Sequence, residues 1–304
     1  MVEALFDAPG GALCLVAPDE RLLRLADRLW ERAGGGRPTS QVELSFSPAA
    51  VDAAADPERA LRWSVADEVV RLDGAGAIDL VMERSARRAR ATVSEGLLSA
   101  EPALVARLAL EAPAAFFATA THQVLHAGAL AGPSGAVVLR GAAGAGKSTL
   151  VAAGWAAGLT VVSDESLLVD RADPDSLCAA VRDLTLLPVS ASLLGLLPLT
   201  RAVLSGGEEK RRVDLFAGAA PSHRRARRVA TLLLGPREPG PARLVPVDGA
   251  ALLALFEEGT IPQETAWGGD PRPIAAAWAG RDVFRLDGAA DLLGAVEIVT
   301  RLTR

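Results

Sequence analysis

Gly141-Ala142-Ala143-Gly144-Ala145-Gly146-Lys147-Ser148-Thr149 is the stretch of this sequence that decides its fold. Its residues Gly141 to Ser148 match the pattern G-x-x-x-x-G-K-[ST], the glycine-rich loop that cradles the phosphates of a nucleotide. The apolar run before it, residues 136–140, is typical of a short buried strand, and the alanine-rich run from Ser148 to Ala157 is typical of a helix. A strand and a helix on either side are the setting in which this loop binds nucleotides. The sequence therefore predicts an α/β nucleotide-binding core.

Each residue type in this loop has a physical reason. Glycines let successive backbone N–H groups turn toward a phosphate at the N-terminus of a helix, where the helix dipole also favours negative charge. We expect the whole stretch to contact ATP, with Lys147 reaching the β- and γ-phosphates and the Ser148 hydroxyl ligating Mg²⁺. The alternative is a Gly/Ala-rich turn in a chain that contains 29 glycines. The flanking strand and helix favour the nucleotide.

Lysine is rare in this chain. Of its 32 basic residues, only Lys147 and Lys210 are lysines. Arginine therefore fills the positions that need only a positive charge. The expected role of Lys147 is that of a compact charge among phosphates, a role that the planar guanidinium of arginine does not reproduce. Lys210 lies in Gly206-Gly-Glu-Glu-Lys-Arg-Arg212, either as a second phosphate-facing residue or in a solvated charged turn.

Composition limits the classes of protein to consider. With 304 residues, of which 50% are hydrophobic, the chain can bury a core in one large domain or two unequal ones. A net charge of −5 favours neither nucleic acid nor an anionic membrane as a partner. Cys14 and Cys178 lack a C-x-x-C spacing and the three histidines form no ligand pattern. Neither a disulfide framework nor a zinc site is predicted.

Two apolar stretches raise the question of a membrane. Residues 112–139 contain histidines, a glutamine and proline, and residues 184–200 contain two prolines. Both are interpreted as buried structure of a protein that does not cross a membrane. The first ten residues carry Glu3 and Asp7 and lack a basic segment, so no signal peptide is predicted and the cytoplasm is the expected location.

The order of predicted elements divides the chain at about residue 115. Residues 1–115 are predicted to form a smaller α+β domain, a candidate for binding an acceptor or partner. Residues 116–304 are predicted to form the P-loop domain, with a helical C-terminal part. In this second domain a strand over residues 159–163 follows the P-loop helix and delivers Asp164 and Glu165 at its carboxyl end. That edge of an open α/β sheet is where ligands bind.

Local patterns predict further elements of both domains. The first domain is expected to begin with a strand over residues 11–17, followed by a helix that Asp19 caps. The apolar stripe of that helix includes Trp30, and the helix is expected to end at residues 34–36. A strand around residues 42–46, a hairpin with an Asp73-Gly74 turn and a helix over residues 99–118 are expected to follow. The second is expected to contain strands over residues 167–170, 229–234 and 282–286, and helices after Asp248 and Pro271.

The chain contains no asparagine, and this excludes two large classes of phosphate-transfer protein. GTPases read guanine through an N-K-x-D loop, and eukaryotic-type protein kinases place an asparagine on the second Mg²⁺. Leu204-Ser-Gly-Gly207 looks like the signature of ABC-transporter ATPases. However, Gly235-Pro236 stands where the Asp-Glu of their second motif should be, and too few residues separate Lys147 from Ser205. We interpret that segment as a turn.

Four features in a fixed order resemble the catalytic core of HPr kinase/phosphorylase. They are His126-Ala-Gly128 ahead of the P-loop, the P-loop itself, Gly158 at the end of its helix, and the strand Val161-Val-Ser-Asp-Glu165. That family places a histidine on the strand before a P-loop and an acidic pair on the strand after it. The resemblance covers residues 123–170, with a fainter likeness over residues 210–234.

This resemblance implies an ATP- and Mg²⁺-dependent kinase with an HPr-kinase type of core. It implies that Asp164 is the general base for an acceptor hydroxyl, that Glu165 and Ser148 lie around Mg²⁺, and that His126 orients the acidic pair or touches the transferring phosphoryl group. The family carries Asp-Asp where this chain has Asp-Glu, so either carboxylate is a candidate base and either a candidate metal ligand.

Phosphoryl transfer depends mainly on positioning and charge neutralisation, and a carboxylate near the metal and the nucleophile suits this reaction. The alternatives are a turn cap for Asp164, a solvated neighbour for Glu165 and a core histidine for His126.

The acceptor follows only from analogy within this resemblance. The glycine-rich signature that supports hexamer contacts and the phosphorylase reaction in the family is missing here, which leaves a homo-oligomer open. The chain is more similar to HPr-kinase-like proteins that phosphorylate a serine of a ribosomally made peptide, such as a lasso-peptide precursor. Candidate contacts to the acceptor or its phosphate are Lys210, Arg211 and Arg212, and the cluster Arg224, Arg225, Arg227 and Arg228. A solvated charged face is the alternative for both groups.

Three rival functions stay open at this point. They are a non-catalytic nucleotide-sensing module whose first domain binds a partner, an ordinary ATPase, and a kinase that acts on a small molecule. Transfer of labelled phosphate to an acceptor, hydrolysis without an acceptor, and binding without either reaction distinguish them.

Overall fold

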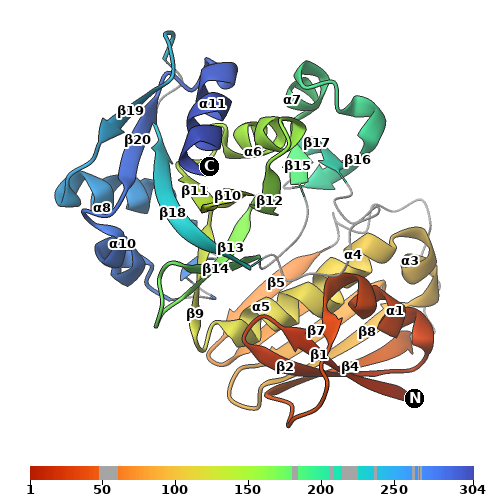
Figure 1. Ribbon diagram of the computed structural model, residues 1–304. Helices are drawn as coiled ribbons and strands as arrows, with labels where there is room; N and C mark the ends of the chain where they lie inside the picture. Colours follow the sequence, from red (N-terminus) through yellow and green to blue (C-terminus); the bar gives the residue numbers. More distant parts are fainter. Residues whose placement is uncertain are drawn as a thin grey trace. The chain divides into compact units, whose positions relative to one another are not determined.

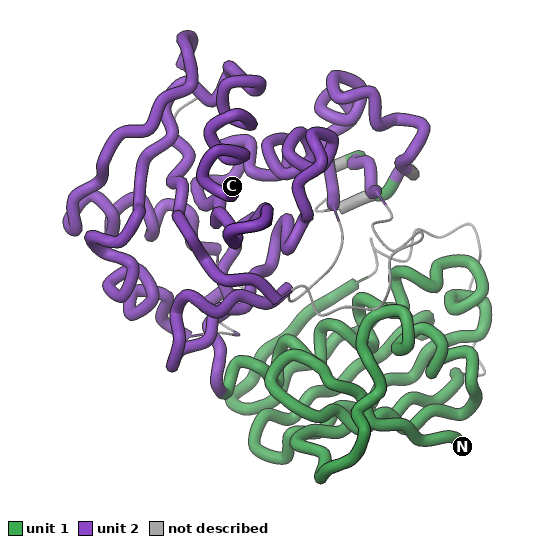
Figure 2. Tube along the Cα trace, in the orientation of Figure 1, with its two compact units in different colours: residues 1–120, 203–209, 216–223 green, residues 121–202, 210–215, 224–304 purple. Residues whose placement is uncertain are grey.

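The computed structural model describes residues 1–47, 61–179, 184–205, 208–213, 225–235, 238–261, 264–265, 267 and 269–304. In this part of the chain the protein is mixed α/β, with two large mixed β-sheets and a small antiparallel one (Figure 1). Unit 1 comprises residues 1–120, 203–209 and 216–223, and unit 2 comprises residues 121–202, 210–215 and 224–304 (Figure 2).

Unit 1 holds a sheet whose described strands follow the order β3-β1-β2-β4-β8-β7-β6-β5. These strands are β1 (Val2–Ala8), β2 (Gly11–Ala17), β3 (Glu31–Arg32), β4 (Ser40–Ser47), β5 (Arg62–Ala66), β6 (Val69–Asp73), β7 (Ile78–Glu83) and β8 (Arg88–Ser94). Strand β4 runs parallel to β2 and β8, and the other described pairs are antiparallel. The predicted strand over residues 11–17 and the hairpin of β6 with β7 are confirmed.

The first helix is shorter than its sequence pattern suggests. Asp19 caps α1 (Glu20–Leu29) as predicted, because its carboxylate accepts a hydrogen bond from the Arg21 backbone N–H. The prediction that Trp30 lies in the helix is wrong. Trp30 is extended (φ −139°), and its buried ring lies 6.2 Å from the ring of Phe6 on β1. Burial against the sheet and pairing of the next two residues with β1 outweigh the helical pattern.

The helix predicted over residues 99–118 is a succession of segments. They are α3 (Glu95–Ala100), α4 (Pro102–Ala106), a π-helical turn (Arg107–Glu111) and α5 (Ala112–Ala118). Ser94 caps α3 by accepting from the Leu97 N–H. Proline lacks an N–H and its ring clashes with the preceding turn, so a helix ends before Pro102 and a new one begins with it.

Unit 2 is built on a second sheet, with the described strand order β12-β10-β11-β18-β14-β13-β9 and with β20 pairing both β18 and β19. Its strands are β9 (His122–His126), β10 (Gly128–Gly132), β11 (Gly135–Arg140), β12 (Thr160–Ser163), β13 (Ser166–Asp170), β14 (Ser176–Ala179), β18 (Arg225–Leu234), β19 (Arg243–Pro246) and β20 (Val283–Asp287). Strand β10 is antiparallel to both β11 and β12, and β18 is parallel to β11 and β20. The carboxyl ends of β11, β12, β18 and β20 therefore meet at one edge of the sheet, which we call the P-loop edge.

Helices cover both faces of this sheet. Alternate residues of β11 face opposite ways: Val137 and Leu139 join the core under α6 (Lys147–Ala156) and α11 (Leu292–Leu302), whereas Val138 joins the core under α8 (Gly249–Glu258) and α10 (Arg272–Trp278). The elements predicted around the P-loop, after Asp248 and after Pro271 are confirmed. Strand β18 begins four residues before its predicted start.

Glycines let the helix that follows the P-loop approach the sheet closely. A Cβ atom on Gly154 of α6 would lie 2.4 Å from Leu130 Cδ1, and one on Gly128 of β10 would lie 2.7 Å from Val151 Cγ2. Both contacts are shorter than carbon atoms tolerate. The glycine of His126-Ala127-Gly128 is therefore required for packing α6 against β10.

The small sheet contains β15 (Leu184–Leu186), β17 (Glu208–Val213) and β16 (Thr200–Ser205), and α7 (Pro188–Leu193) and a 3-10 turn (Leu197–Leu199) connect β15 to β16. The interpretation of residues 184–200 as buried is wrong in part. Val189, Leu193 and Leu199 are 71%, 72% and 61% exposed. Within the described residues, none of the helices is long and apolar enough to cross a membrane.

Candidate functional site

The P-loop lies at the carboxyl end of β11 and depends on two glycines for its shape. Gly144 (φ +79°) and Gly146 (φ +102°) adopt left-handed backbone conformations that side chains disfavour. Gly146 is the N-cap of α6, and its carbonyl accepts the first helical hydrogen bond from the Leu150 N–H. Ala142, Ala143 and Gly144 are exposed, so the outer part of the loop is open to a ligand. Ser148 is half-buried in the first turn of α6.

Lys147 is a buried cation held by neutral groups. Its side chain is folded back on the loop, where Nζ donates to the carbonyl oxygens of Gly141 (2.8 Å) and Ala142 (3.2 Å). Burial lowers the pKa of Lys147, the nearby Arg140 charge lowers it further, and the carboxylates of Asp164 and Glu165 partly oppose this shift. An anion placed beside Lys147 would stabilise the charged form, because opposite charge offsets the cost of burial.

The acidic pair lies in the bend between β12 and β13. Asp164 is only 3% exposed, and its Oδ2 accepts a hydrogen bond of 3.1 Å from the backbone N–H of Thr185 on β15. Glu165 is exposed. Both carboxylates lie close enough to Lys147 to act on its pKa. Because β10 is antiparallel to both β11 and β12, the P-loop after β11 and the acidic pair after β12 lie at the same edge of the sheet.

A two-stranded ribbon explains why His126 lies beside the acidic pair. Strand β10 pairs with β12 and β9 pairs with β13, so residues 122–132 run antiparallel to residues 160–170. Both strands of the ribbon are interrupted at the same level, where the Ala127 N–H donates to the Glu165 carbonyl (3.2 Å) and His126 is opposite Ser166. The histidine that precedes the P-loop and the carboxylates that follow it are thus neighbours.

His126 is a neutral imidazole at pH 7. Burial, followed by the positive charges of Lys147 and Arg140, lowers its pKa from 6.5 to about 4, with a smaller contribution from Lys210. The Glu165 backbone carbonyl partly opposes this shift. Among the described residues, its buried Nδ1 atom has no hydrogen-bond partner. A ring nitrogen is therefore left for a ligand group.

The basic run that contains Lys210 is a strand rather than a turn. Lys210, Arg211 and Arg212 lie on β17, where Arg212 is opposite Thr185 and Arg211 is opposite Leu186 of β15. The hypothesis of a charged turn is therefore wrong for Lys210. Thr185 is the residue whose N–H holds Asp164, and the Lys210 charge acts on His126, so β17 borders the acidic pair.

The second arginine cluster lies away from the P-loop edge. Arg224 falls outside the described residues, and Arg225 and Arg227 are exposed near the amino end of β18. The register of β18 places Arg228 beside Ala136, at the opposite end of β11 from the P-loop. Arg228 forms a 3.0 Å ion pair with Asp175, and Arg227 pairs with Asp173. These two arginines belong to a structural ion cluster.

Sequence reasoning missed a buried ion pair directly under the P-loop. Arg140, the residue before Gly141, pairs with Glu264 (Nη2 to Oε1, 3.0 Å), and both side chains are fully buried. Its Nε donates to the Phe256 carbonyl (3.0 Å) and its Nη2 to the Thr260 hydroxyl (2.8 Å). Burial lowers the pKa of Arg140 and raises that of Glu264. A charged residue at the end of an apolar strand was the available signal, but nothing local pointed to Glu264.

Oxygen atoms are the candidate metal ligands here. They are the Ser148 hydroxyl and the carboxylates of Asp164 and Glu165. Within the described part of the chain, no group of three or more His, Cys, Asp or Glu side chains is arranged to hold a metal ion. Mg²⁺ fits this donor set, because it is usually held by one or two carboxylates together with substrate phosphates. Cys14 and Cys178 are both buried.

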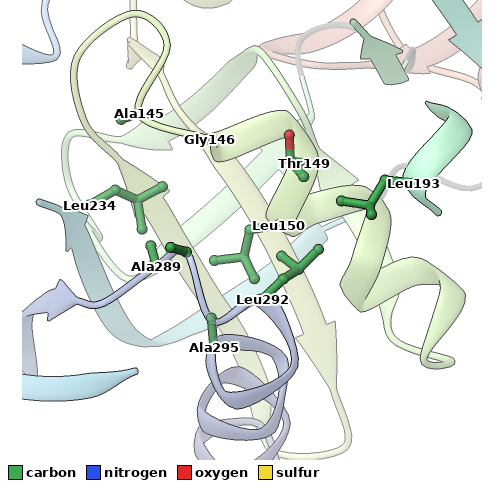
Figure 3. Close-up of a pocket in the computed structure, with 10 residues that line it drawn as sticks. Ala145, Gly146, Thr149, Leu150, Leu193, Leu234, Ala289, Leu292 and Ala295 are labelled. Carbon is green, nitrogen blue, oxygen red and sulfur yellow. The ribbon is translucent and has the colours of Figure 1, made fainter. Parts of the chain in front are cut away.

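A small cavity opens on the other side of the P-loop. It has a volume of about 230 Å³ and is lined by Gly146 and Thr149 of the loop and α6, Leu193 of α7, Leu234 at the end of β18, and Ala289 and Leu292 before and in α11 (Figure 3). The Thr149 hydroxyl lies 3.0 Å from the Ser190 hydroxyl of α7. The P-loop is thus bordered by charged groups on one side and by an apolar cavity on the other.

Comparison with known protein families and with curated proteins finds no match to this chain. The function is therefore inferred from the geometry of the site. That geometry combines an open glycine-rich loop, a buried lysine and two carboxylates at one edge of a sheet.

Proposed function

We propose that this chain is an ATP- and Mg²⁺-dependent kinase with an HPr-kinase type of P-loop core. It transfers the γ-phosphoryl group to a hydroxyl, in the first place a serine of a peptide or protein. A ribosomally made precursor such as a lasso peptide is the acceptor that the sequence resemblance suggests. One observation carries the proposal: the buried Lys147 contacts the glycine-rich loop and lies close enough to Asp164 and Glu165 for their charges to act on its pKa.

Nucleotide binding follows from the state of Lys147. The loop offers backbone N–H groups at the start of α6, where the helix dipole favours anions. On binding, Lys147 exchanges its two carbonyl partners for phosphate oxygens. Charge-assisted hydrogen bonds to phosphate are stronger than those to neutral carbonyls, so this exchange favours the bound state.

Asp164 is the better candidate for the general base. It is buried, and the Thr185 N–H fixes one of its oxygens at 3.1 Å, so its orientation is set before an acceptor arrives. It takes the proton of the acceptor hydroxyl as the new O–P bond forms and the bond between the γ-phosphorus and ADP breaks. Mg²⁺, when bound, neutralises charge on the phosphates. The exposed Glu165 and the Ser148 hydroxyl would hold it.

His126 and Lys210 complete the charge pattern around the acceptor. A neutral imidazole can donate or accept a hydrogen bond at pH 7, so His126 is suited to orient the acidic pair or the transferring group. Lys210, on β17, supplies a positive charge on the same side. Arg211 and Arg212 lie on the same strand, next to Thr185 and Leu186.

Phosphate transfer from ATP labelled at the γ-position to a pool of serine-containing peptides tests the proposal. The wild type should label a peptide, and Asp164→Asn should reduce the rate by about 10²- to 10⁴-fold, the usual contribution of a general base. Asp173→Asn, a half-exposed carboxylate paired with Arg227, is the matched control and should keep full activity. Equal transfer by wild type and Asp164→Asn would remove Asp164 from the base role. Binding without transfer would favour the nucleotide-sensing module, and rapid hydrolysis without acceptor would favour an ATPase.

A further inference from the structure

The apolar cavity and the acidic pair lie on opposite sides of the P-loop strand. In the sheet, β12 lies two strands from β11 by way of β10, and its end carries Asp164. Strand β20 lies two strands away in the other direction by way of β18, and its end leads to Ala289. Both ends reach the same edge. A triphosphate in the loop with its γ-phosphate toward Asp164 therefore directs the rest of the nucleotide toward β20 and the cavity.

The size of the cavity suits part of a ligand. Pockets that enclose a whole small molecule usually measure roughly 300–1,000 Å³. At about 230 Å³ this cavity is smaller, and it is bordered by Gly146 and Thr149, which are residues of the P-loop stretch itself. The cavity therefore matches one flat ring system of a ligand, with the rest of that ligand continuing along the P-loop.

The surroundings of the cavity disfavour a second anion. Asp291, the N-cap of α11, turns its carboxylate onto the backbone N–H groups of Gly294 (3.1 Å) and Ala242 (3.2 Å), so the start of this helix is already capped by a negative charge. Leucine and alanine side chains form most of the wall (Figure 3). An uncharged, largely apolar group is the occupant that such a wall stabilises.

The side chains of the lining also offer little means of reading hydrogen-bonding groups. Among the described residues that line the cavity, Thr149 has the only side chain able to form hydrogen bonds, and its hydroxyl lies 3.0 Å from that of Ser190. We infer that this cavity holds the nucleobase of the bound nucleoside triphosphate by apolar contact, without selecting among bases. This inference rests on the proposed function, because it requires a triphosphate in the P-loop.

Weak selection has a physical basis. A site that pairs buried polar groups with a substrate rejects an analogue that lacks those groups by about 10⁴-fold or more, whereas an apolar pocket discriminates by only about 10- to 200-fold even for a change in size. Adenine and guanine have similar sizes and differ in their polar edges. We therefore expect ATP and GTP to bind with affinities within about threefold of each other, since an apolar wall does not read those edges.

Calorimetric binding of ATP, GTP and inorganic tripolyphosphate to the full chain tests this inference. In the wild type, ATP and GTP should bind alike and both more tightly than tripolyphosphate, because only they fill the cavity. Ala289→Phe places a ring at the half-buried wall of the cavity and should weaken ATP binding about tenfold, a loss comparable to that of one buried side-chain contact. Its affinity for tripolyphosphate should stay unchanged, which also shows that the variant is folded.

Two further variants make the test decisive. Ala290→Phe fills the cavity from its exposed side and should reproduce the effect if Ala289→Phe does not fold. Leu293→Phe changes a residue that is 79% exposed at the start of α11 and is the matched control, with ATP affinity unchanged. Equal weakening of ATP and tripolyphosphate, no weakening of ATP, or a preference for ATP over GTP above tenfold would overturn the inference. Failure of both ATP and tripolyphosphate to bind would instead overturn the proposed function, and this inference with it.

Discussion

The two ends of the unit 2 sheet both gather charged side chains, but they hold these charges in opposite ways. At the amino end of β18, Asp175 accepts hydrogen bonds from Arg228 and Arg281, and Arg227 pairs with Asp173. Burial alone would raise the pKa of Asp175, but the two arginines lower it below its usual range. Charge meets opposite charge there, as in an ion cluster that stabilises a fold.

At the P-loop edge the charges are held mainly by neutral groups. Lys147 donates to two backbone carbonyls, Asp164 accepts from a backbone N–H, and burial keeps His126 neutral. Keeping Lys147 charged costs stability, because burial lowers its pKa and so disfavours the charged form. Under the proposed function, the Lys147 charge meets its counter-charge in the phosphates of a ligand, whereas the charges at the other end of the sheet meet theirs within the fold. Substitutions at the P-loop edge should therefore affect activity, and those at the other end should affect stability.

The largest effect is expected from Lys147→Ala. Under the proposed function this variant removes a cation from the transferring phosphates, so the transfer rate should fall by about 10²- to 10³-fold. The free energy of unfolding should stay equal or rise, because the variant removes a buried charge whose pKa burial has lowered. Labelled-ATP assays and urea denaturation measure the two quantities. Arg225→Ala, an exposed cation of β18, is the control and should change neither. A clear loss of stability in Lys147→Ala with full activity would reverse the comparison.

An effect of intermediate size is expected from Arg228→Leu at the other end of the sheet. Arg228 is 7% exposed, and its guanidinium lies 5.0 Å from the ring centre of Trp278. Its loss should lower the free energy of unfolding by about 2 kcal/mol. The loss is smaller than for a buried ion pair whose remaining charge has no other partner, because Asp175 keeps its hydrogen bond from Arg281. ATP affinity should not change. The exposed pair of Arg227 with Asp173 is the control, and Arg227→Ala should cost no more than about 1 kcal/mol. Weaker ATP binding by Arg228→Leu at unchanged stability would contradict the assignment.

The smallest effect is expected from the titration of His126. Its pKa in the folded protein, about 4, lies below the unfolded value of 6.5, so the unfolded chain binds the proton more readily and stability falls as pH falls between these values. Between pH 7 and pH 5.5 the loss from this group is about 1 kcal/mol. His126→Gln should remove that part of the acid sensitivity in urea denaturation. His122→Gln, at the other end of β9, is the control and should leave the buried imidazole and its acid sensitivity in place. Identical pH dependence in wild type and His126→Gln would show that His126 is not held neutral.

Elements with strong local patterns could be predicted from the sequence. The glycines at left-handed positions, the apolar strand before them and the caps at Asp19 and Asp248 all act within a few residues, and the structure has β11, α6, α1 and α8 accordingly. The error at Trp30 shows the limit of such patterns. Its apolar ring fits a helical stripe equally well, and only the position of Phe6 in the folded unit decides where it is buried.

The supporting residues of the site could not be predicted, because they come from distant parts of the chain. Asp164 is held by the N–H of Thr185, which depends on how β15 lies and has no side-chain signal at all. Arg140 finds its counter-charge in Glu264, which the sequence separates from it by most of unit 2. The cavity is made of leucines and alanines that are indistinguishable in sequence from core residues. Motifs identify the groups that do chemistry, whereas the groups that position them appear only in the fold.

A crystal structure with a non-hydrolysable ATP analogue and Mg²⁺ tests the central claim most directly. The account predicts that the triphosphate lies against the backbone N–H groups of the P-loop, that Lys147 Nζ has left the carbonyls of Gly141 and Ala142 for phosphate oxygens, and that the γ-phosphate faces Asp164. A triphosphate bound elsewhere, or bound in the loop with its γ-phosphate directed toward Ala289 and away from Asp164, would contradict it.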